Sequence, residues 1–247
     1  ASLSGVEEAL ALYRRGFDSG DADILSRADL HASMAVARMT MLYASLFALP
    51  GIPLLYAGDE TATLNDYSYR DVKGKKDDSR WVNRIAADWK RIERIGALAG
   101  APLADASFSA ASATSATSCV PSGDPAEWLL TRQARVFAAL KRIIAVRKAE
   151  PAFHGSSVEF VDIGDARVLA FVRRARTENG VSVVRVLANF SEEPVLVHPR
   201  ARGSAFVHAA CAGGNDLLSG EELGRAGAIP LAPYQAIWLK EKTYEEM

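Results

Sequence analysis

Residues 49–81 read LPGIPLLYAGDETATLNDYSYRDVKGKKDDSRW, and the character of the chain changes halfway along this stretch. The run from Ile52 to Ala57 is apolar, carries no charge and is bounded by Pro50-Gly51 and Gly58. Because it is too short for a helix, we predict a strand that is buried on both faces. Asp59 and Glu60 follow without a spacer, so the strand is expected to end in a polar loop.

The expected loop is rich in carboxylates, arginines and aromatic rings. Its polar members are Asn65, Asp66, Arg70, Asp71, Asp77, Asp78 and Arg80, and its aromatic members are Tyr67, Tyr69 and Trp81. Aromatic faces combined with a few placed polar groups are typical of small-molecule sites. This composition indicates a site that faces a sugar or another polar ligand.

The motif GIPLLYAGDE at residues 51–60 resembles the last barrel strand of the α-amylase superfamily, which is family 13 of the glycoside hydrolases. The continuation TATLNDYSYRD, with KDDSRWVNR after it, is similar to the amylosucrase group, whose members transfer glucose from sucrose onto an α-glucan, and to the related sucrose hydrolases. The resemblance runs from about residue 30 to residue 240 and fails at 85–126. It implies the C-terminal part of a (β/α)8 barrel, with its last strand and flanking helices, followed by an antiparallel β-sandwich domain.

Arg80 is the main candidate for substrate binding. A planar guanidinium suits bidentate pairing with a carboxylate, and such a pair can close the floor of a pocket. In the amylosucrase group the arginine of the matching DSRW motif pairs with an Asp much earlier in the full protein, so the resemblance implies that the partner of Arg80 is outside this chain. The alternative is a surface Arg80 that pairs with Asp77 or Asp78.

Asp59 and Glu60 occupy the rim at the end of the expected strand, where barrel enzymes collect their chemistry. In the family this motif mainly shapes the pocket wall, so contact of either residue with sugar is the less favoured reading. Trp81 could stack on a sugar ring, but we favour the role of a packed loop anchor.

The chemistry of glycoside cleavage is not visible in this sequence. Retaining enzymes need two carboxyls about 5 to 5.5 Å apart, a nucleophile and an acid/base. The family places these two groups, and a third Asp in a motif that ends in His-Asp, on earlier barrel strands. The 247 residues contain no His-Asp pair. We therefore expect no catalytic residue in the chain, catalytic carboxylates upstream of Ala1, an inactive chain by itself, and no metal or other cofactor.

The composition limits the partners. The 29 Lys and Arg nearly balance 30 Asp and Glu, so neither nucleic acid nor a membrane is an expected partner. The resemblance to the amylosucrase group implies sucrose and α-glucan as the partners. The uncharged run 39–58 is broken by Pro50, Gly51 and Pro53 and is too interrupted to cross a membrane. No secretion signal opens the chain, which favours a cytoplasmic location. Cys119 and Cys211 are interpreted as ordinary thiols, and the oligomeric state stays open.

Helices dominate the first part of the chain, which we assign to residues 1–152. Ser4 and Glu7 have the spacing of a capping box for a helix over about 5–15, and a second helix, with start signals at Ser26 and Asp29, should end near Ala48. His31 is expected to be solvated or capping. Residues 96–125 are interpreted as a flexible Ala/Ser-rich insertion, and a further helix from Glu127 should end at Pro151.

From residue 153 the pattern changes to short alternating runs, and 153–247 are assigned to the β-domain. The expected strands are 158–161, 168–173, 181–189, 195–197, 205–209 and 236–239, with turns that include Gly213 to Asp216. An alternative from another functional class is that 153–247 form an independent carbohydrate-binding or interaction module. The lack of an evident row of exposed aromatic residues argues against it.

Overall fold

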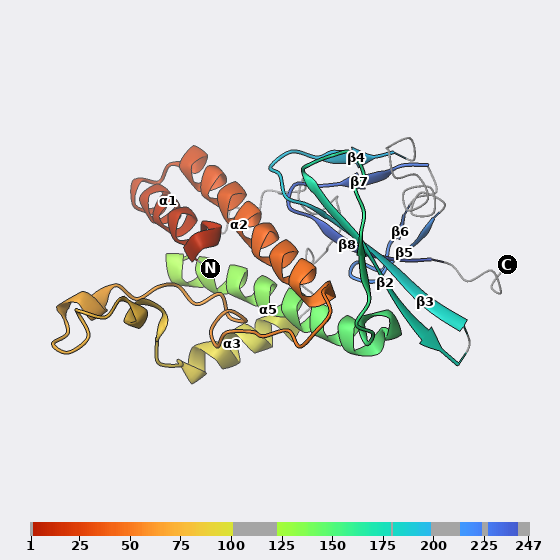
Figure 1. The fold of residues 1–247 in the computed structure, drawn as a ribbon. Helices are drawn as coiled ribbons and strands as arrows, with labels where there is room; N and C mark the ends of the chain where they lie inside the picture. The colour runs from red at the N-terminus through yellow and green to blue at the C-terminus, as the bar shows by residue number, and fades with distance from the viewer. Residues whose placement is uncertain (1, 101–122, 179, 199–212, 224–226, 242–247) are drawn as a thin grey trace. The chain divides into compact units, whose positions relative to one another are not determined.

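The structure is a computed structural model that describes residues 2–100, 123–178, 180–198, 213–223 and 227–241. The described residues form two compact units (Figure 1). The first contains residues 2–36, 55–100 and 123–138, and the second contains 37–54 and the described residues from 139 onward. The predicted domain boundary at 152/153 stays a prediction.

The first unit is built from helices. It holds α1 (Val6–Ser19), the first part of α2 (Ala22–Ala48), α3 (Trp89–Gly100) and the first part of α5 (Pro125–Ala149), with 3-10 turns η1 (Ser2–Ser4), η2 (Ser68–Asp71) and η3 (Ser79–Asn83). The α1 and α2 backbones approach closely, since a Cβ on Gly16 would lie 3.0 Å from both Ile24 and the Leu25 amide. Trp128 of α5 stacks on Tyr13 of α1 with ring centroids 4.4 Å apart.

The first two helices exist, but their predicted start signals are wrong. The N-cap of α1 is Gly5, which offers no side-chain cap. Helix α2 begins earlier than expected because the Asp21 carboxylate accepts the amides of Asp23 and Ile24, at 2.9 and 3.1 Å. Asp29 instead accepts a hydrogen bond from Trp128 Nε1 at 2.6 Å. His31 is exposed, as expected.

The predicted buried strand Ile52–Ala57 is not present. Within the described chain these residues belong to neither sheet, and Ile52 and Leu54 are 90% and 81% exposed. A strand is stabilised by pairing its amides and carbonyls with a neighbour. None of the described strands pairs with this segment, so it stays irregular despite its strand-like sequence.

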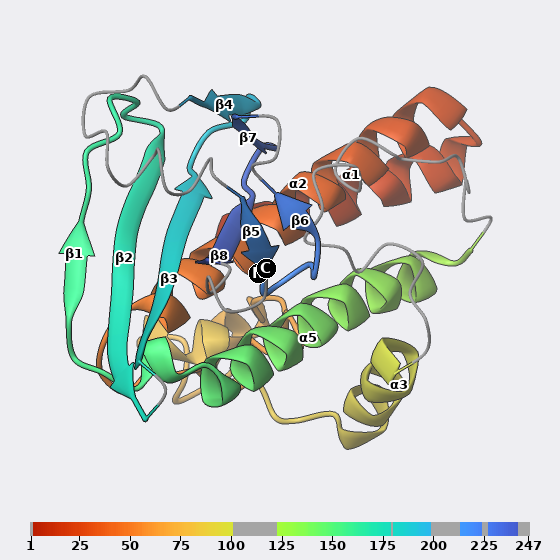
Figure 2. The same cartoon turned by 90° about the vertical axis from the view of Figure 1, so that its right-hand side faces the viewer.

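The second unit contains the sheets. A six-stranded antiparallel sheet has the order β1-β2-β3-β8-β5-β6, and a two-stranded sheet joins β4 to β7 (Figure 2). The strands are β1 (Val158–Phe160), β2 (Val168–Thr177), β3 (Gly180–Asn189), β4 (Val195–Val197), β5 (Gly214–Asp216), β6 (Glu222–Leu223), β7 (Ile229–Leu231) and β8 (Ala236–Glu241). The antiparallel pairing expected for this region is confirmed.

The six-stranded sheet is covered on both faces within its own unit. One face shares an apolar core with the two-stranded sheet, made of Ile163, Val168, Ala170, Val172, Leu187, Val195, Val197, Ile229, Leu231, Ile237 and Leu239. On the other face Trp238 packs on Phe153 of η4 (Pro151–Phe153), with ring centroids 4.5 Å apart. Side chains alternate between the two faces, and because both faces are covered, apolar residues follow one another in Val168–Val172 of β2, Val186–Ala188 of β3 and Ala236–Leu239 of β8.

Three strands were not predicted: β5, β6 and β7. The cluster Gly213–Asp216, expected as a turn, contains β5. Its Gly214 is needed for pairing, because a Cβ there would lie 2.3 Å from the Lys240 carbonyl oxygen. The predicted strand 205–209 and both cysteines lie outside the described residues.

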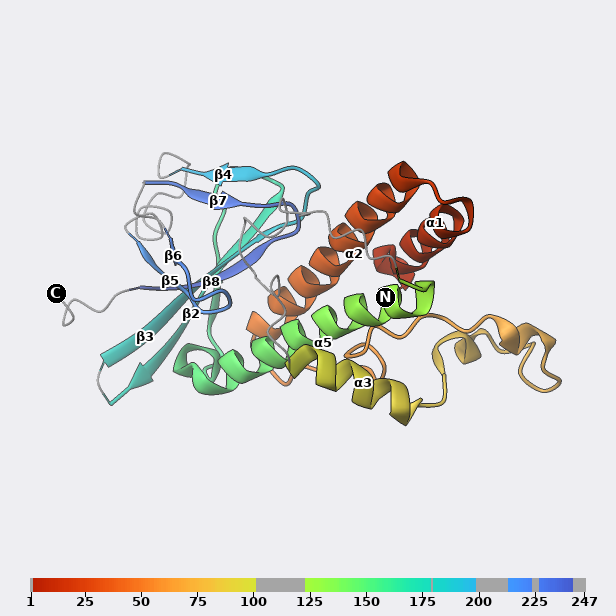
Figure 3. The ribbon, with the colours of Figure 1, turned by 180° about the vertical axis from the view of Figure 1, so that it is seen from behind.

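The expected insertion is helical at its start, since α3 continues to Gly100, while 101–122 lie outside the described residues. Helix α3 runs beside α5 (Figure 3), and Arg94 pairs with Glu127 at 2.6 Å. The helix predicted from Glu127 is confirmed as α5, with Pro125 at its first position. None of the helices in the described part of the chain is long and apolar enough for a membrane span.

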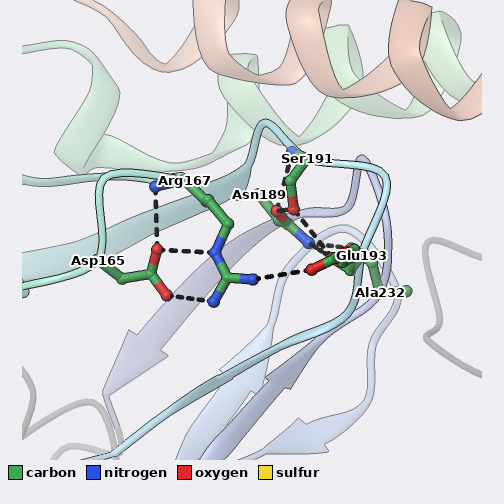
Figure 4. A network of polar contacts seen from close by, with 6 residues as sticks. All are labelled: Asp165, Arg167, Asn189, Ser191, Glu193 and Ala232. Atoms are coloured by element: carbon green, nitrogen blue, oxygen red, sulfur yellow. Dashed lines mark hydrogen bonds and ion pairs between the residues drawn. The ribbon is translucent and has the colours of Figure 1, made fainter.

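A buried amide closes the turn after β3 (Figure 4). Asn189 Nδ2 donates to the carbonyls of Glu193 and Ala232, at 2.7 and 2.9 Å, and its Oδ1 accepts from the Ser191 amide at 3.0 Å. Both ends of this fully buried side chain are therefore satisfied, as a buried amide requires.

Candidate functional site

The candidate site is the polar loop, defined as residues 58–83, which lies in the first unit. It opens with a tight turn around Gly58, whose φ of +103° favours glycine. Glu60 Oε2 accepts the Gly58 amide at 2.8 Å, and the Gly58 carbonyl accepts the Thr63 amide at 2.9 Å. The carboxylate of Glu60 is thus engaged in shaping its own turn.

Asp59 lies in the same turn. Its amide donates to the Tyr56 carbonyl and its carbonyl accepts the Ala62 amide, both at 3.0 Å. Ala62 is buried, and its carbonyl accepts from Gln133 Nε2 of α5 at 3.2 Å. The structure therefore brings Asp59 and Glu60 together in a turn that α5 anchors.

Glu7 of α1 holds the next part of the loop, and sequence reasoning missed this role. Its Oε1 accepts the Asn65 amide at 3.0 Å and the Ser2 hydroxyl at 2.6 Å. Its Oε2 accepts the Tyr67 hydroxyl at 3.2 Å. Helical spacing identified Glu7 as a capping residue, and no local pattern could have shown a partner about 60 positions away.

Arg80 pairs with Asp78, two residues before it. Its Nε and Nη2 donate to the two carboxylate oxygens at 2.8 and 2.9 Å, and its amide donates to Oδ1 at 3.0 Å. The hydrogen bonds from Arg80 lower the pKa of Asp78 to about 2. The Arg80 side chain is 71% exposed, so its outer surface faces solvent. This is the local pairing that the sequence left open.

The aromatic rings of the loop lie against cations. Lys75 Nζ lies 4.4 Å from the centroid of the Trp81 ring, and the Arg84 guanidinium lies 5.7 Å from it. Arg70 lies over Tyr67 in the same manner, at 5.3 Å. Such contacts hold exposed aromatic side chains in place. Trp81 is half-buried, an environment that suits a loop anchor.

The electrostatics of the loop suit binding better than acid catalysis. Hydrogen bonds from Ser68 lower the pKa of Asp66, and those from Arg80 lower the pKa of Asp78. A general acid at neutral pH needs a raised carboxyl pKa, so neither group fits that role. Across the part of the chain that the structure describes, no three His, Cys, Asp or Glu side chains gather in a way that could hold a metal ion. The loop offers fixed carboxylates, an exposed guanidinium and aromatic faces.

Comparison with known proteins gives distant structural similarity. No family model matches the sequence. The chain is similar to AmyP, solved with maltose, at 14% identity and a TM-score of 0.47 over 84% of this chain and 35% of AmyP. It is similar to the alpha-glucosyl transfer enzyme XgtA at 20% identity and a TM-score of 0.46, over 83% of this chain and 36% of XgtA. The trehalulose synthase MutB from Pseudomonas mesoacidophila MX-45 matches at 15% identity and a TM-score of 0.44, over 83% and 38% of the two chains. This chain thus spans little more than a third of each of these proteins.

Proposed function

We propose that the chain is the C-terminal portion of a sucrose-using glucosyl transferase of the amylosucrase type. The observation that carries this proposal is the motif from Gly51 to Trp81, whose GDE turn and DSRW segment both lie in the polar loop. The loop presents an exposed guanidinium at Arg80, beside carboxylates that are ionised at neutral pH. These are groups that orient a polar ligand by hydrogen bonds.

The proposed reaction is a retaining double displacement. A carboxylate attacks the anomeric carbon of the glucosyl unit of sucrose while a carboxylic acid protonates the departing fructose oxygen. A hydroxyl of an α-1,4-glucan then attacks the glucosyl-enzyme, and the same acid/base removes its proton. Both carboxyls would come from sequence upstream of Ala1, and the chain alone would be inactive.

Arg80 would exchange its partner in the complete protein. The Arg80 side chain of the Asp78 pair is 71% exposed and the Asp78 side chain 31%, and solvent-accessible pairs contribute little to stability because water screens them. A carboxylate from the upstream sequence could therefore replace Asp78 as the partner of the guanidinium with little loss of free energy. The new bidentate pair, being less exposed, would form the floor of the sugar pocket.

A sucrose hydrolase is the competing proposal, because the sequence of residues 51–81 resembles both groups and a hydrolase differs only in using water as the acceptor. The products of the complete protein separate the two. Elongated glucan together with fructose indicates a transferase, whereas glucose and fructose in equal amounts indicate a hydrolase.

The reading frame upstream of Ala1 tests the proposal. We expect an open frame that encodes a nucleophilic Asp, an acid/base Glu and a His-Asp motif, each after a predicted barrel strand. A frame without these carboxylates, or one that begins at Ala1, would overturn the proposal.

A further inference from the structure

The carboxyl end of α2 is held by two arginines from distant parts of the chain. The last turn of α2 contains no basic residue of its own. Arg147 of α5 donates through Nη1 to the carbonyl of Phe47 and, at 3.0 Å, to that of Leu49, and through Nη2 to that of Gly51 at 2.8 Å. Arg173 of β2 donates to the carbonyl of Ala48.

The guanidinium of Arg173 is fully buried and bonded only to backbone carbonyls among the described residues. Besides Ala48, it donates through Nε to Ser157 at 2.8 Å and through Nη2 to Gly155 and, at 3.4 Å, to Phe153. It therefore joins the end of α2 to η4 and to the segment that leads into β1. All of these residues belong to the second unit.

Within the part of the chain that the structure describes, the two guanidinium groups are satisfied by backbone carbonyls and not by carboxylates. Burial lowers the pKa of both guanidinium groups, and the charge of Arg147 lowers that of Arg173 further. No carboxylate in the described chain pairs with either one, so two like charges share a partly dry site. Their compensation is the partial negative charge of a helix carboxyl end and its unpaired carbonyls.

Arginine suits a positioning role because its donors point in fixed directions from one rigid plane. The bonded carbonyls at Phe47, Ala48, Leu49 and Gly51 cover the last turn of α2 and the turn after it. Gly51 has a φ of +102°, so the chain changes direction there. The residues that follow, Ile52 and Leu54, project into solvent.

We propose that Arg147 and Arg173 are positioning residues that fix the exit segment, defined as residues 49–54, in one direction as it leaves α2. The segment is thereby held ready for strand pairing, and ordering it in advance lowers the entropy lost when a partner strand docks. The proposal rests on the proposed function only for the source of that partner, a strand of the complete protein.

Amide hydrogen exchange of the whole 247-residue chain tests whether the two arginines hold the carboxyl end of α2. In Arg147→Gln we expect the amides of residues 45–49 to exchange about tenfold faster, since charge-assisted hydrogen bonds are lost. The matched control is Arg142→Gln on the same helix, because Arg142 donates to the carbonyls of Leu217 and Leu218 instead. It should leave 45–49 unchanged and accelerate exchange at 216–220.

A crossed pattern of this kind cannot come from a general loss of stability. The proposed role of Arg147 would be wrong if Arg147→Gln and Arg142→Gln accelerated exchange equally at residues 45–49 and 216–220. It would also be wrong if exchange at 45–49 were unchanged in Arg147→Gln. Arg173→Lys is the second variant, because it keeps the charge and the aliphatic stem but cannot reach all four carbonyls. It should also accelerate 45–49 by several-fold, and wild-type exchange there would count against the role of Arg173. These outcomes are independent of whether the complete protein uses sucrose.

Discussion

The Arg80 guanidinium forms two parallel hydrogen bonds with the Asp78 carboxylate, two residues earlier, and Arg167 repeats this arrangement with Asp165. In the second pair Nε and Nη2 donate to the carboxylate at 3.0 and 2.7 Å, and the Arg167 amide donates to Oδ1 at 3.0 Å (Figure 4). An Asp-x-Arg segment thus forms this pair from local geometry alone. The sequence environment, and not the pair itself, distinguishes Arg80 as a site candidate.

The two arginines make a matched pair for mutation. In the 247-residue chain, Arg80→Ala and Arg167→Ala should both leave the melting temperature nearly unchanged, because both side chains are exposed. In the complete protein, Arg80→Ala should reduce fructose release from sucrose at least about a hundredfold, by analogy with the loss of a buried charged contact. Arg167→Ala should keep wild-type activity.

Arg80→Lys adds a geometric control, since lysine keeps the charge but cannot form the bidentate pair. We expect it to recover little of the lost activity. Full activity in either Arg80 variant would remove Arg80 from the site.

Glu150 gives the second unit an acid-sensitive link. It is buried at the end of α5 and accepts hydrogen bonds from Lys240 Nζ at 2.6 Å, the Ala152 amide at 3.0 Å and the Ser182 hydroxyl. Burial raises the pKa of Glu150, but these bonds outweigh it and leave the pKa lowered. The ionised form is therefore favoured by the folded state, and its contribution is lost as pH falls through the folded pKa.

We expect Glu150→Gln to lower the free energy of unfolding at pH 7 by about 2 kcal/mol, because the charged hydrogen bond to Lys240 is lost. The difference from wild type should shrink below about pH 4, where Glu150 is protonated in the unfolded chain. Urea unfolding at several pH values measures this. A difference that stays constant down to pH 3 would contradict the assigned link. Burial raises the pKa of Asp216, so its effect on the free energy of unfolding as pH falls is opposite to that of Glu150. This effect is the same in wild type and in Glu150→Gln, so it cancels in the comparison.

Asp29 carries a partly buried ion pair in the first unit. It accepts hydrogen bonds from Trp128 Nε1 and from Arg132, whose pKa burial lowers to about 10. Asp29→Asn should lower the free energy of unfolding by about 2 to 3 kcal/mol, because Arg132 is left without its countercharge. Thermal unfolding checks this value, with Asp23→Asn, at an exposed position of the same helix, as the control. Equal effects of the two substitutions would exclude a special role for Asp29.

Replacing each of two glycines by alanine should change the stability of the protein in opposite directions. At Gly214 the new methyl group would meet the Lys240 carbonyl at 2.3 Å, so β5 must move away from β8, and we expect a loss of about 2 kcal/mol. Gly96 lies inside α3 with nothing within 4 Å of its Cβ position, and alanine there should stabilise by up to about 1 kcal/mol. Chemical denaturation of both variants tests the pair. A stable Gly214→Ala protein would mean that the strands do not pair as described.

Helices and strands that are determined by patterns of neighbouring residues were predicted well from the sequence. The apolar periodicity of α5 and the short apolar runs of β2, β3 and β8 mark the residues that face a core, so the positions of these elements could be derived from the sequence. The strands β5, β6 and β7 were missed because they are only two or three residues long; in addition, β5 contains a glycine and β7 a proline. The pairing at Gly214 becomes visible only when its partner Lys240 is known.

The other differences between the predictions and the structure come from contacts between residues that are distant in the sequence. The run Ile52–Ala57 has a strand composition, but composition cannot supply the neighbour that a strand requires. The link between Glu7 and Asn65 and the arginines at the end of α2 join positions separated by 58 to 125 residues. In the candidate site, the sequence identified the loop and its charged members, while the pairing of Arg80 with Asp78 had to be observed.

Fructose release from sucrose tests the central claim most directly. The protein encoded by the complete reading frame and the 247-residue chain should be assayed side by side with sucrose and an α-1,4-glucan acceptor. The account predicts fructose and elongated glucan from the complete protein and no fructose above background from the chain alone. Clear turnover by the 247-residue chain, or a folded complete protein that leaves sucrose intact, would contradict it.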